Sequence, residues 1–149
     1  MSIGFYCNRE VVVVEPHASV LEAAQIMREH HVGTLVVVEK SENENHPKGI
    51  VTDRDLVLEI MAPNLDPEVI LVSDIMNEAL FTAREKDEVV DVVQAMRSHS
   101  VRRIPVVNDR GVLEGIVSMD DLIVLVAEEM DEIAKLILQE PDRESALRR

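Results

Sequence analysis

The sequence lacks tryptophan and has very few other aromatic residues, so its core has to be built from aliphatic side chains. One tyrosine and two phenylalanines make up 2% of the 149 residues, whereas 46% are hydrophobic. The single cysteine, Cys7, cannot form a disulfide within the chain, which is typical of a reducing compartment and predicts a cytoplasmic location. No apolar run reaches the roughly 20 residues of a membrane span, and residues 1–10 lack the pattern of a secretory signal.

Positive charge is also scarce. Fifteen Lys and Arg residues stand against 29 Asp and Glu residues, which gives a formal net charge of −14. A field of this sign repels nucleic acids and anionic lipid surfaces, because proteins that bind them need many cations to displace counterions. We therefore predict no nucleic-acid partner and no membrane partner. A small anionic ligand is still compatible with this charge if a local pocket supplies hydrogen-bond donors or a few cations.

What the sequence does contain is an internal repeat. Residues 49–55 (GIVTDRD) are similar to residues 115–121 (GIVSMDD), and residues 27–32 (MREHHV) are similar to residues 96–101 (MRSHSV). The upstream segments are 69 positions apart (27 to 96) and the glycines 66 (49 to 115), so a loop in the first copy is three residues longer. A repeat of this period indicates that the structural unit is about half of the chain.

In the first copy, the pattern predicts the order strand, helix, strand, strand, helix. Residues 11–14 are a β-branched run and residues 35–38 an aliphatic run too short for a helix, so both are predicted strands. Ser19 and Glu22 have the spacing of a capping box, which predicts a helix with one apolar stripe after Ser19. The remaining predicted elements of this copy are a polar loop at 41–47, a strand at 49–51 and a helix at 52–60.

The second copy repeats this order, and its last helix is predicted to be longer. Its predicted strands lie at 80–82, 104–107 and 115–117, and its first helix has a stripe formed by Val89, Val92, Val93 and Met96. The last helix starts at Ser118 and keeps an apolar face to about Gln139. Pro141 is predicted to end this helix, and a loose charged tail is predicted to follow to Arg149. The apolar face consists of Leu122, Val126, Met130, Ile133 and Ile137.

Neither copy is expected to fold alone, because a unit of roughly 60 residues buries too little surface. We predict an α+β fold in which two β-α-β-β-α units pack sheet to sheet about a pseudo-twofold axis, with an extended C-terminal helix. Residues 62–67 (APNLDP) are a turn-rich connector. The predicted divisions are a first unit at 8–62, a second unit at 72–130, and a C-terminal helix extension and tail at 131–149.

The doubled motif carries a resemblance to a known family. Each copy of G-h-h-[ST]-x-x-D follows an apolar strand and an M-R-x-x-x-V helix end, and residues 74–76 (DIM) and 101–107 (VRRIPVV) complete the pattern. Over about residues 8–130 the chain resembles paired cystathionine-β-synthase (CBS) domains, also called a Bateman module. The resemblance implies a stand-alone CBS pair with no attached enzyme domain. It also implies an adenosine-containing ligand such as AMP, ADP, ATP or NAD, with no cofactor required.

The residue types at two helix starts suit the sugar and phosphate of such a ligand. Thr52 and Ser118 would expose a hydroxyl beside unpaired backbone N–H groups and the positive end of a helix dipole, which suits phosphate. Asp55 and Asp121 lie one turn further on, where an ionised carboxylate accepts hydrogen bonds from ribose hydroxyls. The alternative is that T-x-x-D and S-x-x-D are ordinary capping boxes that need no ligand. We expect capping and binding to coexist.

Adjacent arginines distinguish the second copy from the first. Arg102 and Arg103 stand where the first copy has Gly33 and Thr34. Two arginines at the entry of a buried strand need either acidic partners or a ligand phosphate. In the family that the chain resembles, this segment borders the nucleotide, so we assign one or both to phosphate, with Arg54 as a further candidate. The second copy is therefore expected to be better equipped for a charged ligand, and salt bridges are the alternative.

The leading hypothesis is a non-catalytic sensor that transmits adenine-nucleotide occupancy to an unidentified partner protein. No metal site is predicted, because His30 and His31 are adjacent and cannot both face one ion from a helix. No enzymatic activity is predicted, because the motif carboxylates lack a neighbouring nucleophile and base. A homodimer is expected from the apolar face of the last helix. The alternatives are a ligand-independent dimerisation or interaction module, a nucleotide hydrolase or synthase, and a sensor of an S-adenosylmethionine-type ligand, which would leave the arginines unexplained.

Overall fold

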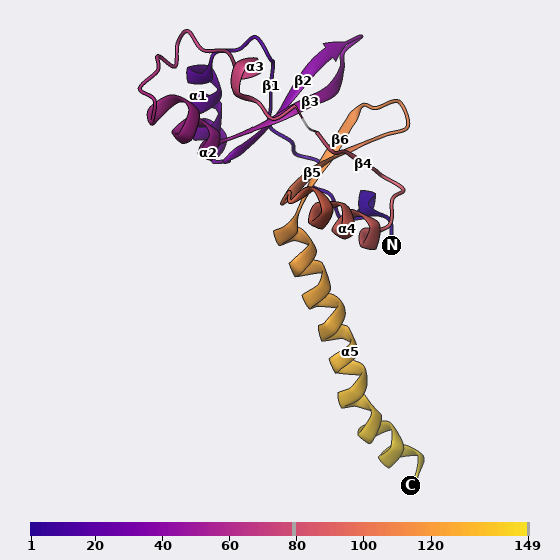
Figure 1. The fold of residues 1–149 in the computed structure, drawn as a ribbon. Coiled ribbons are helices and arrows are strands. Elements are labelled where there is room, and N and C mark those ends of the chain that lie inside the picture. Colours follow the sequence, from indigo (N-terminus) through magenta and orange to yellow (C-terminus); the bar gives the residue numbers. More distant parts are fainter. Residues whose placement is uncertain (79, 149) are drawn as a thin grey trace.

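The computed structural model describes residues 1–78 and 80–148, which form two similar lobes and a long projecting helix (Figure 1). Each lobe contains a three-stranded mixed sheet, in which the first strand runs parallel to the middle strand and the third runs antiparallel to it. The predicted α+β architecture of two β-α-β-β-α units is therefore confirmed. The strand orders are β1 (Val13–Val14), β2 (Thr34–Ser41), β3 (Glu44–Thr52) in the first lobe and β4 (Ala83–Arg84), β5 (Arg103–Val107), β6 (Leu113–Ser118) in the second.

One amphipathic helix packs against each sheet, namely α1 (Val20–His30) in the first lobe and α4 (Val89–His99) in the second. The Ser19 hydroxyl accepts a hydrogen bond of 3.1 Å from the backbone N–H of Glu22, so the predicted N-cap of α1 is confirmed. Both helices end at a residue in the left-handed region, which turns the chain toward the next strand. These residues are His31 (φ 54°) and Ser100 (φ 53°).

The other helices connect the lobes or extend from them. The helix predicted at 52–60 is a short α-helix, α2 (Asp53–Leu56), followed by a π-helical segment, η2 (Val57–Met61). The segment that joins η2 to β4, which we call the connector from here on, extends beyond the turn-rich residues 62–67 and contains α3 (Val72–Ile75). A 3-10 turn, η1 (Ile3–Phe5), lies near the N-terminus. The last helix, α5 (Met119–Leu147), projects away from both lobes (Figure 1).

The core of each lobe is aliphatic, as the shortage of aromatic residues predicts. Leu35, Val37 and Val51 have no exposed surface in the first lobe, and neither do Ile104 and Val117 in the second. Burying one such side chain stabilises a fold by about 1.5–3 kcal/mol. The lobes meet where β3 and β6 are in contact.

Each lobe is completed by a segment that precedes the other copy. Ile3 is fully buried in the core of the second lobe, and the backbone of Asn8 exchanges hydrogen bonds of 2.8 and 2.9 Å with Ile116 of β6. In the same way, Val72 of the connector is buried in the first lobe, and the Asn77 N–H donates to Ile50 of β3 over 3.0 Å. The repeat pattern alone did not predict this exchange, which ties the two lobes together.

The strand predictions at the lobe edges are partly wrong. The strand predicted at 80–82 lies instead at Ala83–Arg84, and only the last two residues of the predicted strand at 11–14 are paired. The loop predicted at 41–47 is a β-hairpin, because Glu42 (φ 53°) and Asn43 (φ 63°) adopt the two positive φ angles of a tight two-residue turn. Pro47 is accommodated in β3 beside a bulge, where a missing N–H costs little.

The end of α5 also differs from the prediction. Pro141 was predicted to end the helix, and the residues after it were predicted to be loose, but α5 continues to Leu147. A proline inside a helix removes one hydrogen bond, the one that its own nitrogen would donate. The following turn is held by the Ser145 hydroxyl, which donates to the Pro141 carbonyl over 3.0 Å. Arg149, the last residue of the predicted tail, lies outside the described residues.

Candidate functional site

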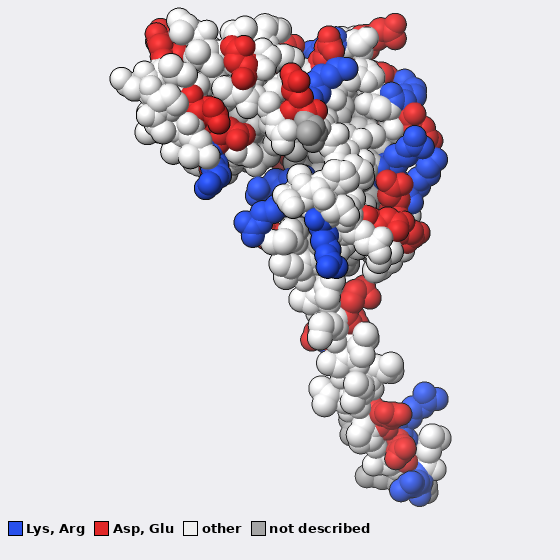
Figure 2. Space-filling view, viewed as in Figure 1, with Lys and Arg blue, Asp and Glu red and all other residues white. Residues whose placement is uncertain are grey.

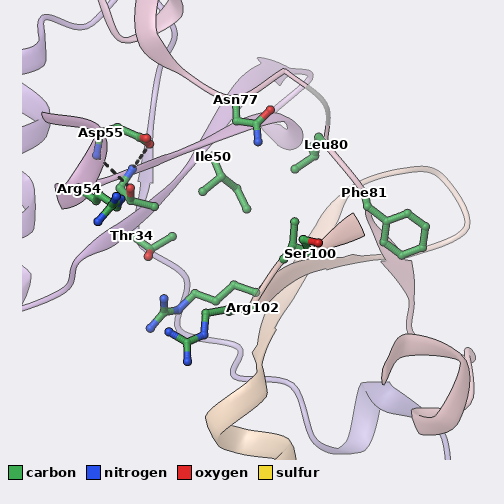
Figure 3. Close-up of a pocket in the computed structure, with 12 residues that line it drawn as sticks. Thr34, Ile50, Arg54, Asp55, Asn77, Leu80, Phe81, Ser100 and Arg102 are labelled. Carbon is green, nitrogen blue, oxygen red and sulfur yellow. Dashed lines mark hydrogen bonds between the residues drawn. The ribbon is translucent and has the colours of Figure 1, made fainter. Parts of the chain in front are cut away.

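A cleft between the lobes, which we call cleft 1, contains the motif of the first copy. Its volume is about 370 Å³. The start of α2 contributes one wall and the entry to β5 contributes the other, so both lobes build the cleft (Figure 3). Its lining residues are Thr34, Ile50, Thr52, Arg54, Asp55, Asn77, Leu80, Phe81, Ser100, Val101, Arg102 and Arg103.

Thr52 and Asp55 form a reciprocal capping box at the start of α2. The Thr52 hydroxyl oxygen accepts from the Asp55 N–H over 3.2 Å, and Asp55 Oδ2 accepts from the Thr52 N–H over 2.8 Å. The predicted cap is therefore present. It leaves the Thr52 hydroxyl hydrogen and the second Asp55 oxygen available to a ligand, because an ionised carboxylate can accept several hydrogen bonds.

The backbone N–H groups at this helix start are not available to phosphate, contrary to the expectation from the sequence. The Asp53 N–H donates to the Gly33 carbonyl over 2.9 Å, and the Arg54 N–H donates to Asp53 Oδ1 over 2.8 Å. With the Thr52 and Asp55 N–H groups engaged in the cap, the first turn is fully satisfied. Any anion in cleft 1 therefore depends on side chains.

Three arginines supply those side chains. Arg54, Arg102 and Arg103 are exposed residues that line cleft 1, and within residues 1–78 and 80–148 their guanidinium groups make no hydrogen bond or salt bridge. The salt-bridge alternative is therefore not what the structure contains. Figure 2 shows basic side chains where the two lobes meet, and Figure 3 shows Arg102 extending from the second lobe toward Thr34.

A second cleft, which we call cleft 2, contains the motif of the second copy and has a volume of about 320 Å³. The Ser118 hydroxyl oxygen accepts from the Asp121 N–H over 3.1 Å, and Asp121 Oδ2 accepts from the Ser118 N–H over 3.0 Å. The opposite wall contains His31, Gly33 and Thr34. Cleft 2 is therefore built like cleft 1, with a capped motif facing the entry to the other lobe's middle strand.

The structure places Arg102 apart from Ser118 and Asp121, the motif residues of its own copy. Arg102 lies in cleft 1 with Thr52 and Asp55 of the first copy, not in cleft 2 with the motif of its own copy. Arg103 lines both clefts. The reason is the contact between β3 and β6, which places the entry to β5 opposite the start of α2. The expectation that the second copy's motif is better equipped for a charged ligand is therefore wrong in its geometry.

Sequence reasoning missed the wall of cleft 1 that the connector supplies. Asn77, Leu80 and Phe81 line the cleft, and the Phe81 ring lies 4.7 Å from the His99 ring, measured between centroids. Leu80 adds apolar surface on which a flat base can pack, whereas the Phe81 ring points away from the other labelled residues and packs against the core of the second lobe (Figure 3). One signal was available, because Asn77 repeats Asn8 at the same offset of 69 that relates the two helix ends.

The motif glycines, Gly49 and Gly115, are required because another segment of the backbone passes close to each of them. A Cβ on Gly49 would lie 2.8 Å from the Asn77 carbonyl oxygen, and one on Gly115 would lie 2.9 Å from the Asn8 carbonyl oxygen. Both distances are shorter than real contacts of this kind. The close approach predicted at these glycines is therefore made by the exchanged segments, which cross β3 and β6 beside the two clefts.

Burial raises the pKa of the Cys7 thiol, and a protonated thiol is a poor nucleophile at neutral pH; Cys7 lines neither cleft. Across the part of the chain that the structure describes, no group of three or more His, Cys, Asp or Glu side chains could hold a metal ion. In the same part, none of the helices combines the length and the apolar character needed to cross a bilayer.

Comparison with known proteins identifies the family. The CBS domain model matches residues 3–62 and 72–128, so the chain belongs to the CBS domain family and contains a tandem pair. The CBS domain-containing protein YhcV of Bacillus subtilis is 36% identical over 115 residues, which are 77% of this chain and 78% of YhcV. Protein MK0525 of Methanopyrus kandleri is 36% identical over 123 residues, which are 83% of this chain but only 61% of MK0525.

Two solved structures of similar fold contain adenosine compounds. The CBS domain protein PAE2072 from Pyrobaculum aerophilum, complexed with AMP, is 28% identical with a TM-score of 0.73, over 82% of this chain and 90% of PAE2072. The CBS domain pair of protein MJ0100, in complex with 5′-methylthioadenosine and S-adenosyl-L-methionine, is 25% identical with a TM-score of 0.74. That match covers 87% of this chain and 98% of the MJ0100 pair. The matched region of this chain consists of CBS domains, and no catalytic domain is evident in it.

Proposed function

We propose that this protein is a non-catalytic sensor that binds a phosphorylated adenosine ligand in cleft 1. The observation that carries the proposal is the set of three unpaired guanidinium groups around one cleft in a chain of net charge −14. Unpaired cations gathered at one place suit a phosphate, which accepts charge-assisted hydrogen bonds from arginine. AMP, ADP, ATP and NAD all meet this requirement.

The chemistry of the cleft walls suggests where the ribose, the phosphate and the base of the ligand bind. The free Asp55 oxygen accepts from the ribose hydroxyls, and Arg102 and Arg103 hold the phosphate with help from Arg54 and the Thr52 hydroxyl. The base lies against Ile50 and Leu80. A volume of about 370 Å³ falls within the range of roughly 300–1,000 Å³ that is common for small-molecule pockets.

The relatives support an adenosine ligand and leave its identity open. AMP in PAE2072 and S-adenosyl-L-methionine in MJ0100 are ligands of those proteins. For this chain we favour the phosphorylated compound, because an S-adenosylmethionine-type ligand carries a net positive charge and offers only one carboxylate to the three arginines of cleft 1. Both lobes line cleft 1, so occupancy shifts the equilibrium between their arrangements, and an unidentified partner protein reads the difference. The cytoplasmic location stays a prediction from the single cysteine.

The homodimer is proposed to form through α5. Ile123, Val126, Met130, Ile133 and Ile137 are spaced alternately three and four residues apart, and each is more than half exposed. This is the 3.5-residue spacing of a helix that packs against another helix. Leu122, which was predicted to belong to this face, is buried in the second lobe instead, and Ile123 takes its place.

A second copy of this chain is the occupant that the stripe fits. The charged residues of this stretch lie off the stripe, and Lys135 is paired on its own helix with Asp131 at 3.0 Å and Glu132 at 3.3 Å. On the face that Figure 2 shows, the middle of α5 is largely uncharged. An uncharged stripe matches itself across a twofold axis without bringing acidic groups together, and two acidic chains can therefore associate there.

Isothermal titration of the purified chain with AMP tests the proposed function. We expect saturable binding, and we expect Arg102→Ala to weaken it roughly tenfold or more, because a hydrogen bond to a charged group contributes about 1.5–3 kcal/mol. The control is Arg97→Ala, which removes an exposed arginine on α4 outside the cleft. Absence of heat with AMP, ADP, ATP and NAD alike would refute the proposal.

The rival functions give different results in related assays. A ligand-independent interaction module predicts a melting temperature that no nucleotide changes, whereas a true ligand raises it by mass action. A nucleotide hydrolase or synthase predicts turnover of ATP or NAD by the purified protein. The sensor proposal predicts a nucleotide-dependent melting temperature and no turnover.

A further inference from the structure

The two clefts are lined by equivalent positions of the two copies. Asn77, Leu80 and Phe81 of cleft 1 correspond to Asn8, Val11 and Val12 of cleft 2 at the offset of 69. Residues 100–103 of cleft 1 correspond in the same way to residues 31–34 of cleft 2. Each cleft also contains a capped motif with a carboxylate oxygen left over. The two clefts therefore offer a ligand walls that are built from equivalent positions.

The charges at these equivalent positions are different. In cleft 1, Arg54, Arg102 and Arg103 stand against one carboxylate, Asp55. Among the described residues that line cleft 2, Arg103 is the one Lys or Arg, and it stands with His31 against the carboxylates of Glu10 and Asp121. The difference arises because Gly33 stands in the first copy where the second has Arg102, and because Asp120 stands in the second motif where the first has Arg54. Cleft 1 is therefore net positive and cleft 2 net negative.

We infer that cleft 2 binds an adenosine-class ligand without a phosphate, neutral or cationic at its 5′ end, while the nucleotide is confined to cleft 1. This inference rests on the proposed function of cleft 1. The free Asp121 oxygen accepts from ribose hydroxyls as Asp55 does, which retains the nucleoside part. Glu10 and Asp121 repel a phosphate, and Gly33 leaves it without the guanidinium that Arg102 supplies in cleft 1. The two clefts thus select different ligands because their charges differ, although their walls are built alike.

The test counts binding sites on the full chain with AMP and adenosine as probes. Titration with AMP is expected to fill one site per chain. Adenosine titrated into AMP-saturated protein is expected to fill one further site. Asp121→Asn is expected to weaken the adenosine site at least tenfold and to leave the AMP site unchanged, and Asp55→Asn is expected to do the reverse. Asparagine keeps an oxygen that can accept the capping hydrogen bond, so both variants retain the helix start.

A gain-of-binding variant completes the design. Gly33→Arg places in cleft 2 the counterpart of Arg102, and AMP is then expected to fill two sites per chain. A Cβ on Gly33 would lie 2.7 Å from Asp53 Oδ2, the end of an exposed side chain that can turn away. The melting temperature shows whether this variant is folded. If it is not, the Asp55→Asn and Asp121→Asn pair decides the question alone.

The outcomes separate this inference from the proposed function. AMP that fills two equal sites in the unmodified chain, or adenosine that fails to bind AMP-saturated protein, would overturn the inference and leave the nucleotide function of cleft 1 intact. AMP that binds nowhere would overturn both. One AMP site that is sensitive to Asp55→Asn and one adenosine site that is sensitive to Asp121→Asn is the result that supports it.

Discussion

We propose that Asp55 and Asp121 each have two roles, in which one carboxylate oxygen caps a helix and the other binds a ligand. One oxygen holds the helix start by accepting a backbone N–H at 2.8 or 3.0 Å, and the other is left toward the cleft. The capping box is therefore not an alternative to ligand binding, because the cap fixes the carboxylate in one orientation. A fixed acceptor loses little conformational entropy when a ribose binds.

The cap and the ligand contact can be separated by comparing the two hydroxyls. Thr52→Ala and Ser118→Ala are each expected to lower the free energy of unfolding by about 1 kcal/mol, because each removes an N-cap. Only Thr52→Ala is expected to weaken AMP binding, since Thr52 lines cleft 1 and Ser118 lines cleft 2. Urea denaturation measures the first effect and calorimetric titration the second.

Thr52→Ser is the matched control for this comparison, because it keeps the hydroxyl and should retain both the stability and the affinity. Equal losses of AMP affinity in Thr52→Ala and Ser118→Ala would contradict the assignment of the nucleotide to cleft 1.

At the scale of elements, strong local patterns predicted most of the fold and long-range pairing set the rest. The helix after Ser19 and the aliphatic strands could be predicted, because a stripe or an unbroken apolar run is a local property. The bounds of the two-residue strands β1 and β4 could not be predicted, since they depend on pairing with β2 and β5, although strands were predicted at 11–14 and 80–82. The hairpin was missed because Glu42 is an uncommon residue for a positive φ.

The candidate sites were predicted as residues and not as assemblies. The repeat identified the motif hydroxyls and carboxylates, since they recur at one offset. It could not show which motif Arg102 faces, because that depends on how β3 and β6 meet. The exchanged segments were missed for the same reason, although they supply Asn77 and Asn8 to the two clefts.

The crossing of the connector over β3 makes a prediction at this scale. Gly49→Ala is expected to lower the free energy of unfolding by about 1–3 kcal/mol, the usual cost of forcing an extra group into a packed position. The added Cβ would lie 2.8 Å from the Asn77 carbonyl, which belongs to the backbone and cannot turn away like a side chain.

Lys48→Ala, one residue earlier on β3 and exposed, serves as the control and should change stability by less than about 0.5 kcal/mol. If chemical denaturation gave the same midpoint for Gly49→Ala and Lys48→Ala, the close crossing of the connector over β3 would be disproved.

At the scale of the whole molecule, the acidic net charge makes two local surfaces stand out, one on the long helix and one in cleft 1. A net charge of −14 keeps most of the surface repulsive to other acidic molecules, including copies of the same chain. The uncharged stripe on α5 and the arginines of cleft 1 depart from that charge. We propose that the stripe allows two copies to associate and that the arginines allow a small anion to bind.

The dimer is tested by placing a charge on the stripe. Met130→Glu and Ile133→Glu are each expected to convert the dimer to a monomer, because two buried carboxylates would face each other across the twofold axis. Light scattering after gel filtration measures the mass directly. Neither residue belongs to a lobe core, so the thermal unfolding of each variant should remain cooperative.

Glu128→Gln is the control on the opposite side of α5 and should remain a dimer. A monomeric unmodified chain, or a mass that is unaffected by either stripe variant, would show that α5 does not pair with a second copy.

The most direct measurement is a crystal structure of the full chain grown with AMP. We predict one nucleotide per chain in cleft 1, with the ribose hydroxyls within hydrogen-bond distance of Asp55 and the phosphate within hydrogen-bond distance of the Arg102 guanidinium. AMP bound in cleft 2 beside Asp121, or a cleft 1 closed by the protein's own side chains in the presence of saturating AMP, would contradict it.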